Sequence, residues 1–226
     1  MPHQVTLVIG ASRGIGREFV SQLSRDPTHR VIAGVRKPVD FDSSNVVPIL
    51  LDQSDPESVT RAGTQVSEID TLIINAAIGA DEYLLSTDDE RLREYYDTNV
   101  IGPLRVVRAF LPALKARNTR QIVFISSESG SLSQQINAKG GFRGPYAVSK
   151  AAGNMIVVQL HNELHDQGFT VAAIHPGWVA TDMGNATGPG GMPIPESVKG
   201  QLDVIVKLEH NASATFFAWD GSIVPW

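Results

Sequence analysis

The sequence predicts a single α/β domain, in which helices cover both faces of a doubly wound, mostly parallel sheet of about seven strands. Short apolar runs rich in β-branched residues alternate along the chain with longer segments of helical pattern. Most of these runs are apolar at nearly every position, as strands covered on both faces must be. Alternating strands and helices indicate right-handed crossovers between parallel strands. A chain of 226 residues is long enough for one such core.

The expected elements follow one another in regular order. We expect strands at Val5–Ile9, Arg30–Val35, Val46–Leu51, Thr71–Ile74, Gln121–Ile125, Val171–Ile174 and Phe216–Trp219. We expect helices at Gly16–Ser24, Pro56–Val66, Asp89–Ala116, Tyr146–Gln167 and Pro195–Glu209. No repeat or linker divides the chain, so residues 1–226 are expected to form one domain. Within it, the Gly- and Pro-rich segment 183–200 is either a lid over a substrate or a plain surface loop.

Composition excludes several classes of function. The net charge is −5 and the basic residues form no long run, which disfavours nucleic acid or an anionic membrane as a partner. The absence of cysteine excludes disulfides and thiolate sites. We expect no metal site, because His161 and His165 lack the His-Glu-x-x-His order of a zinc protease. No secretory signal and no apolar stretch of about 20 residues is evident, so we expect a cytoplasmic protein.

A glycine-rich turn joins the first expected strand to the first expected helix. Its spacing is G-x-x-x-G-x-G, and such glycines let the backbone approach a pyrophosphate while the helix N-terminus offers free N–H groups. A plain tight turn is the alternative, but the position inside a βαβ pattern favours a dinucleotide site in a Rossmann-type domain. The residues assigned to this turn are Gly10, Ser12, Arg13, Gly14, Ile15 and Gly16.

The end of the second expected strand indicates which dinucleotide is preferred. An NAD(H) site usually has a carboxylate there for the ribose 2′-hydroxyl, whereas this chain has Arg36. Arg36 and Arg13 together could clamp a 2′-phosphate, although a lone surface arginine is usually only solvated. The sequence therefore favours NADP(H), with NAD(H) less favoured.

The third and fourth expected strands end in further candidates for the cofactor site. Asp52 could accept a hydrogen bond from an adenine amino group, or it could cap the next helix in competition with Asp55. We assign the adjacent Gln53 to the same site. Asn75 and Ala76 follow the fourth strand, where small residues would let a ribose lie against the backbone.

Tyr146 and Lys150 are candidates for the proton chemistry. They are spaced i and i+4 at the start of an expected helix, so both side chains project from one face. A neighbouring cation favours the phenolate, and we therefore expect Lys150 to lower the pKa of Tyr146. As an isolated pair this pattern is common and usually has no function.

Two polar residues on other elements strengthen that hypothesis. Ser127 follows a buried strand and could hydrogen-bond a substrate oxygen near Tyr146, with Ser126 as a local competitor. Asn99 lies beside a Gly-Pro pair in a helical segment, which is typical of a broken helix with a freed carbonyl. Asn99 could bind a water linked to Lys150, or it could be a kink residue only.

Taken together, these residues resemble the short-chain dehydrogenase/reductase family, from about Thr6 to the end of the chain. The Asp220-Gly221 and Pro225-Trp226 pairs resemble its small C-factor-like carbonyl reductase branch. The chain departs from the family pattern in having 18 residues between Ser127 and Tyr146 and alanine at the last glycine of an Asn-Ala-Gly motif. The matching residues are Gly10, Gly14, Gly16, Asn75, Ala76, Asn99, Ser127, Tyr146 and Lys150.

The resemblance implies a reversible NADP(H)-dependent reduction of a ketone or aldehyde to an alcohol. Tyr146 would protonate the carbonyl oxygen, Ser127 would orient it, and Lys150 would bind the nicotinamide ribose. Asn99 would hold a water of a proton relay. The partner would be a small carbonyl or alcohol substrate, and the assembly a homodimer or homotetramer.

The segment after the sixth strand completes the implied cofactor site. By the resemblance, Pro176, Val179 and Thr181 contact the nicotinamide end. Two other functions stay open at this point. One is an NADP(H)-binding sensor or scaffold on the same fold, and the other is a related enzyme that catalyses a non-redox isomerisation, dehydration or cyclisation.

Overall fold

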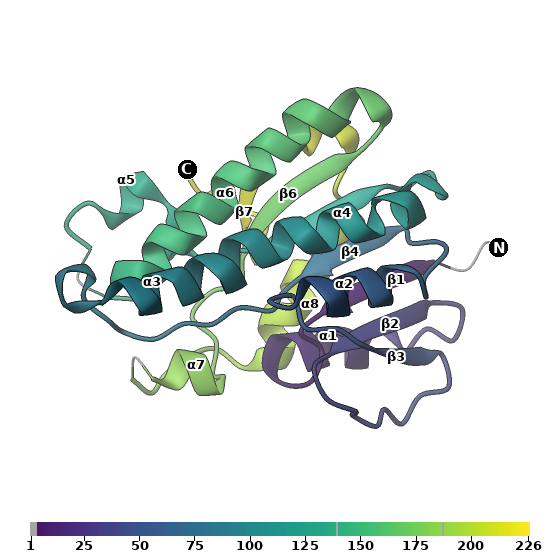
Figure 1. Cartoon of the computed structure of the whole chain (residues 1–226), viewed down its shortest axis with the longest axis horizontal. Coiled ribbons are helices and arrows are strands. Elements are labelled where there is room, and N and C mark those ends of the chain that lie inside the picture. The colour runs from purple at the N-terminus through teal and green to yellow at the C-terminus, as the bar shows by residue number, and fades with distance from the viewer. Residues whose placement is uncertain (1–3, 139, 187) are drawn as a thin grey trace.

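The computed structural model of the chain describes residues 4–138, 140–186 and 188–226. It contains a seven-stranded sheet in the order β3-β2-β1-β4-β5-β6-β7, with every neighbouring pair parallel (Figure 1). This confirms the doubly wound fold of one domain, and the named strands are all parallel where mostly parallel was expected. The strands are β1 Val5–Ile9, β2 Arg30–Val35, β3 Val46–Leu50, β4 Thr71–Ile74, β5 Gln121–Ile125, β6 Thr170–His175 and β7 Thr215–Ala218.

Two apolar layers hold the helices on opposite faces of the sheet. One layer joins strand residues such as Leu7 and Leu72 to α2 (Pro56–Gly63), α4 (Gly102–Lys115) and α6 (Gly144–Leu164). The other joins Val8 and Ile73 to α1 (Gly14–Leu23) and α8 (Ile194–Val206). Successive strand residues point to opposite faces of the sheet. A continuously apolar strand therefore contributes side chains to both apolar layers.

The expected helix Asp89–Ala116 is interrupted near its middle, as its Gly-Pro pair predicts. It consists of α3 (Asp89–Tyr96), a π-helical turn at Asp97–Ile101 and α4. The amide of Gly102 donates to the carbonyl of Asp97, five residues earlier. This wider turn carries Asn99.

Other expected helix bounds differ from the observed ones at their ends. The first helix begins at Gly14 and not at Gly16, and the second ends at Gly63 and not at Val66. The helix that carries Tyr146 begins at Gly144, and its expected last turn is a 3₁₀ turn, His165–Gln167. Helix ends fray and are assigned within one or two residues, which covers most of these differences. The second helix ends three residues early, and so does the last, at Val206 and not at Glu209.

Two short helices were not expected. They are α5 (Leu132–Gln135) and α7 (Asp182–Asn185), which follow β5 and β6 in the chain. Both lie beyond the carboxyl ends of the strands, on the left of the view in Figure 1. None of the described helices is long and apolar enough to cross a bilayer.

The strand order fixes where a ligand site belongs. The chain runs outward from β1 through β2 to β3, then returns to the other side of β1 with β4. Crossovers on the two sides of β1 therefore diverge and leave a crevice at the carboxyl ends of β1 and β4. The predicted site residues after β1, β2, β3, β4, β5 and β6 all fall at this edge.

Candidate active site

A cleft of about 890 Å³ runs along the carboxyl edge of the sheet. It brings together nearly all of the residues that the sequence assigns to the site. Gly16 and Asn99 are the two that do not line it, among the residues the structure describes. Those that line it are Gly10, Ser12, Arg13, Gly14, Ile15, Arg36, Asp52, Gln53, Asn75, Ala76, Ser127, Tyr146, Lys150, Pro176, Val179 and Thr181.

The glycines of the turn after β1 let its backbone pack closely at the edge of the cleft. Gly10 has φ +81°, and a Cβ there would lie 2.8 Å from Ala76. A Cβ on Gly16 would collide with the Gly10 carbonyl oxygen, which also accepts a bond from Asn75 Nδ2 at 3.1 Å. The α1 N-terminus has no side-chain cap. Its first N–H groups therefore remain available for an anion, and the cradle fits a pyrophosphate.

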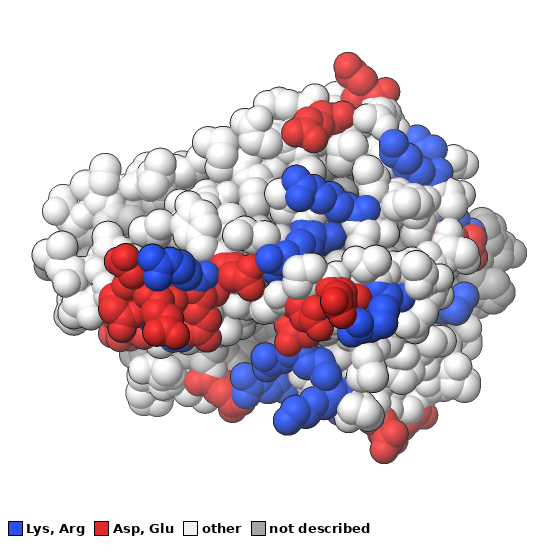
Figure 2. Space-filling model, viewed as in Figure 1, with Lys and Arg blue, Asp and Glu red and all other residues white. Residues whose placement is uncertain are grey.

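The two arginines assigned to a 2′-phosphate are exposed at the mouth of the cleft. Arg13 donates to Asp182 Oδ2 at 3.0 Å, and these side chains are 76% and 83% exposed. Arg36 follows β2 and is also exposed. Figure 2 shows Lys and Arg side chains gathered over α1, beside acidic side chains over α7. An ion pair this exposed contributes little stability, so Arg13 can exchange Asp182 for a phosphate at small cost.

The structure shows which of the two acidic residues after β3, Asp52 or Asp55, caps the next helix. Asp55 caps α2 by accepting from the Glu57 amide at 2.9 Å. Asp52 instead accepts from the Ser54 amide at 3.0 Å, at the cleft wall. The Gln53 side chain is buried and donates to the carbonyls of Ala76 and Thr98, so it braces the wall.

Tyr146, Ser127 and Lys150 meet at one end of the cleft. Burial raises the pKa of Tyr146 to about 12, although a hydrogen bond with Ser127 acts in the opposite direction. The Ser126 hydroxyl donates instead to Asn154 Oδ1, and the role of Ser127 at a substrate oxygen stays a prediction. Burial also lowers the pKa of Lys150 to about 8, and its ammonium donates to the Ile125 carbonyl at 2.8 Å. The pKa of Tyr146 is therefore raised and not lowered as expected, and burial of the phenol is the largest cause of the shift.

Asn99 lies behind the cleft and not in its wall. Its Oδ1 accepts from the Ile78 amide at 2.9 Å, and its Nδ2 donates to the Ile78 carbonyl at 2.8 Å and to Ser149 Oγ at 3.0 Å. Every polar atom of this side chain is thus used to hold other segments. Its backbone oxygen faces α6, 4.0 Å from the position of a Cβ on Gly153. A water-binding role would therefore fall to this carbonyl and stays a prediction.

The segment after β6 forms another part of the cleft wall. Thr181 Oγ1 accepts from the Gly184 amide at 3.0 Å, which leaves its proton able to donate to a ligand. The Met192 amide donates to the Trp178 carbonyl at 2.7 Å, and the Ala180 amide donates to the Met192 carbonyl at 2.9 Å. These bonds anchor part of the segment 183–200. Its role as a lid stays a prediction, and its residue 187 lies outside the described residues.

An apolar wall around Tyr146 was not expected. The ring of Phe142 meets that of Tyr146 edge-on, with centroids 5.1 Å apart, and Ile78 and Met183 pack beside them. A Cβ on Gly79 would lie 2.9 Å from the Tyr146 ring. Sequence patterns give little sign of these contacts, because they join separate loops with no periodicity.

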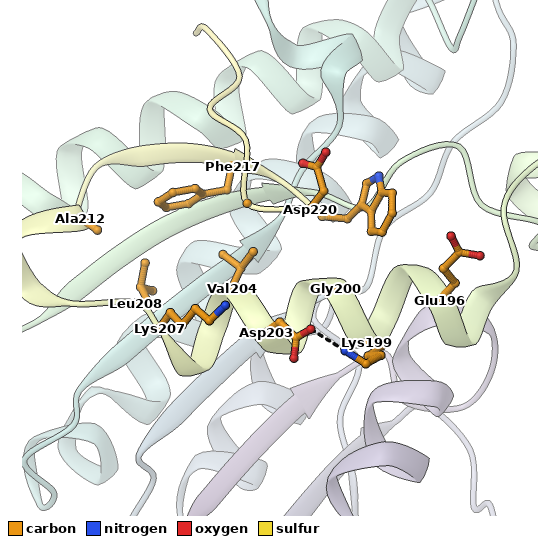
Figure 3. A pocket seen from close by; sticks show the side chains of 12 residues that line it. Glu196, Lys199, Gly200, Asp203, Val204, Lys207, Leu208, Ala212, Phe217 and Asp220 are labelled. Atoms are coloured by element: carbon orange, nitrogen blue, oxygen red, sulfur yellow. Dashed lines mark hydrogen bonds and ion pairs between the residues drawn. The ribbon is translucent and has the colours of Figure 1, made fainter.

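A second cavity, of about 400 Å³, lies between α8 and the segment around β7. Figure 3 shows its side chains: Lys199 and Asp203 form an ion pair on α8, opposite Phe217 and Asp220. None of the predicted site residues lines it. In the described parts of the chain, no cluster of three or more His, Cys, Asp or Glu side chains is arranged to hold a metal ion.

Comparison with known proteins agrees with this geometry. Residues 4–190 match the family model described as short chain dehydrogenase, and the chain belongs to this family of oxidoreductases. An uncharacterized oxidoreductase of Schizosaccharomyces pombe is 34% identical over 99% of this chain and 98% of its own length. The C-signal protein of Myxococcus xanthus is 40% identical over 70% of this chain and 93% of its own.

A solved structure resembles the whole chain. The carbonyl reductase from chicken fatty liver, crystallised with NADPH bound, superposes with a TM-score of 0.93. It is 31% identical in sequence, and the match covers 100% of this chain and 95% of that one.

The close approach of Gly79 to Tyr146 gives a first prediction. In Gly79→Ala the added methyl group would crowd the Tyr146 ring and the Met183 sulfur, 3.0 Å away. Because small displacements of a reacting group are costly, we expect turnover to fall by about 10-fold or more. Gly140→Ala is the matched control in the same cleft, since a Cβ there meets nothing within 4 Å. Equal turnover of the two variants would contradict the predicted crowding.

Proposed function

We propose that this protein uses NADPH to reduce a ketone or aldehyde to an alcohol. The observation that carries the proposal is the joint placement of Tyr146, Ser127 and Lys150 at one end of a cleft whose other end is the uncapped α1 N-terminus. The NADPH-bound chicken carbonyl reductase supports the choice of reaction and of cofactor. A structure described as a short-chain dehydrogenase/reductase from Burkholderia multivorans with bound NADP supports the choice of cofactor; it is 25% identical, with a TM-score of 0.85.

The residues of the cleft suit each part of such a cofactor. The glycine cradle and the first turn of α1 would hold the pyrophosphate, and Arg36 with Arg13 would hold the 2′-phosphate. Asp52 would accept from the adenine amino group. Val179 and Thr181 would fix the carboxamide of the nicotinamide. When bound, NADPH supplies the hydride that adds to the carbonyl carbon.

The protein's own residues would protonate and hydrogen-bond the carbonyl oxygen of the substrate. With a pKa of about 12, Tyr146 is protonated at neutral pH and can donate its proton to the oxygen as negative charge develops there. The Ser127 hydroxyl, which is bonded to Tyr146 in this structure, would turn its single proton to that oxygen when the substrate binds. Lys150, with a pKa of about 8, carries its charge in most molecules at pH 7 and stabilises the phenolate that Tyr146 leaves.

The proton transfer is tested by Tyr146→Phe. This variant keeps the ring that packs against Phe142 but loses the proton donor, so we expect NADPH oxidation with a reactive carbonyl to fall by about 100-fold or more. Cofactor binding, followed by nicotinamide fluorescence, should be unchanged. Undiminished turnover would refute this role of Tyr146. A wild-type protein that binds NADPH and turns over no carbonyl would instead favour a binding function.

The cofactor preference is tested by Arg36→Asp. A carboxylate at this position repels a 2′-phosphate and accepts from a 2′-hydroxyl, so kcat/KM should shift from NADPH toward NADH by about 10-fold or more. Lys37→Asp, on the next exposed residue, makes the same change of charge outside the cleft lining. The same shift in both variants would show that general charge, and not an Arg36 contact, sets the preference.

A further inference from the structure

Asn154 lies on α6 one turn after Lys150, and its side chain is buried with only 4% exposed. Its two amide atoms bond in different directions. Oδ1 accepts from the Ser126 hydroxyl at 2.5 Å, and Nδ2 donates to the Gly130 carbonyl at 3.2 Å. Ser126 and Gly130 lie on either side of Ser127 in the chain. One side chain therefore ties both flanks of the segment that carries Ser127 to the helix that carries Tyr146.

The position of Gly130 determines that of Ser127. The Gly130 amide donates to the Ser127 carbonyl at 2.8 Å, and the Ser129 amide donates to Ser127 Oγ at 3.2 Å. Gly130 also lies directly on α6, since a Cβ there would be 2.7 Å from the backbone carbon of Lys150. The turn is thus short, internally bonded and pressed against α6 beside Lys150.

We propose that Asn154 is a positioning residue, which holds the Ser127 hydroxyl at its bonding distance from Tyr146 by fixing Ser126 and Gly130. The catalytic consequence rests on the function proposed above. Asn154 itself does not line the cleft, among the described residues, so it acts through Ser127 and not on the substrate. An amide suits this role because it accepts and donates at once.

The Asn154→Asp variant gives a pH-dependent signature of this role. An ionised carboxylate still accepts from Ser126, but it places a second oxygen against the Gly130 carbonyl. A protonated carboxyl restores a donor toward Gly130, and burial raises the pKa of such a group into a measurable range. The ratio of variant to wild-type kcat should therefore rise as pH falls. Asn154→Ala, which has no group to protonate, should give a ratio that does not depend on pH.

The comparison includes a control for general loss of stability. Leu160→Ala removes a buried side chain from the same helix, on the side that packs against the sheet, and leaves the Ser127 turn untouched. We expect Asn154→Ala to lower kcat by about 10- to 100-fold, with the NADPH dissociation constant unchanged. Leu160→Ala should lower the melting temperature and leave kcat near the wild-type value.

Hydrogen–deuterium exchange of the folded proteins provides a readout without any substrate. The amides of Ser129 and Gly130 should exchange faster in Asn154→Ala than in wild type or in Leu160→Ala. Unchanged exchange there, or equal kcat losses in Asn154→Ala and Leu160→Ala, would overturn the proposal. If wild type reduces no carbonyl, the proposed function fails, whereas the exchange rates still decide whether Asn154 holds the turn.

Discussion

The close packing of α6 against the turn that follows β5 is the contact on which the rest of the site depends. It buries Lys150, and burial of an ammonium is costly unless polar partners offset the loss of water. The Ile125 carbonyl at the end of β5 is one such partner. Because Lys150 is held there, Tyr146, one turn earlier on α6, must lie beside Ser127. The geometry of the proton donor thus follows from where a helix meets the end of a strand.

Topology places the two halves of the site in one cleft. The reversal of strand order between β1 and β4 opens the edge where the glycine turn lies, and β5 and β6 extend the same edge toward Tyr146. The two ends of the cleft differ in their chemistry. The glycine turn presents bare backbone and a helix N-terminus, which suits phosphate. The other end is buried and apolar, which keeps the proton of Tyr146 in place until an acceptor with developing charge arrives.

Much of this arrangement could be predicted from the sequence, because its signals are local. Most of the seven strands are nearly continuous apolar runs, and the spacing of Gly10 and Gly16 after the first of them predicts the glycine turn. The i, i+4 spacing of Tyr146 and Lys150 is likewise a local signal, because any helix places two such residues on one face. The Gly-Pro pair that interrupts the helix near Asn99 is also a local signal, and a π-helical turn is found there.

The remainder depends on contacts between distant segments. The four-residue helices α5 and α7 are too short to show a period. The contacts of Asn154 and Gly79 cannot be predicted from the sequence, because they form only where the turn after β5 and the loop after β4 pack against α6. The predicted direction of the Tyr146 pKa shift is wrong for the same reason. Sequence shows the neighbouring lysine, but only the fold shows how completely the phenol is removed from water.

The most direct test of the account follows the hydrogen that reaches the substrate. The protein would be given NADPH deuterated on the transferred position of C4, with a reactive aldehyde or ketone, and the product examined by NMR. The account predicts an alcohol with deuterium on the former carbonyl carbon and a solvent-derived hydrogen on its oxygen. A product without deuterium on that carbon, or an altered substrate with no NADPH consumed, would contradict it.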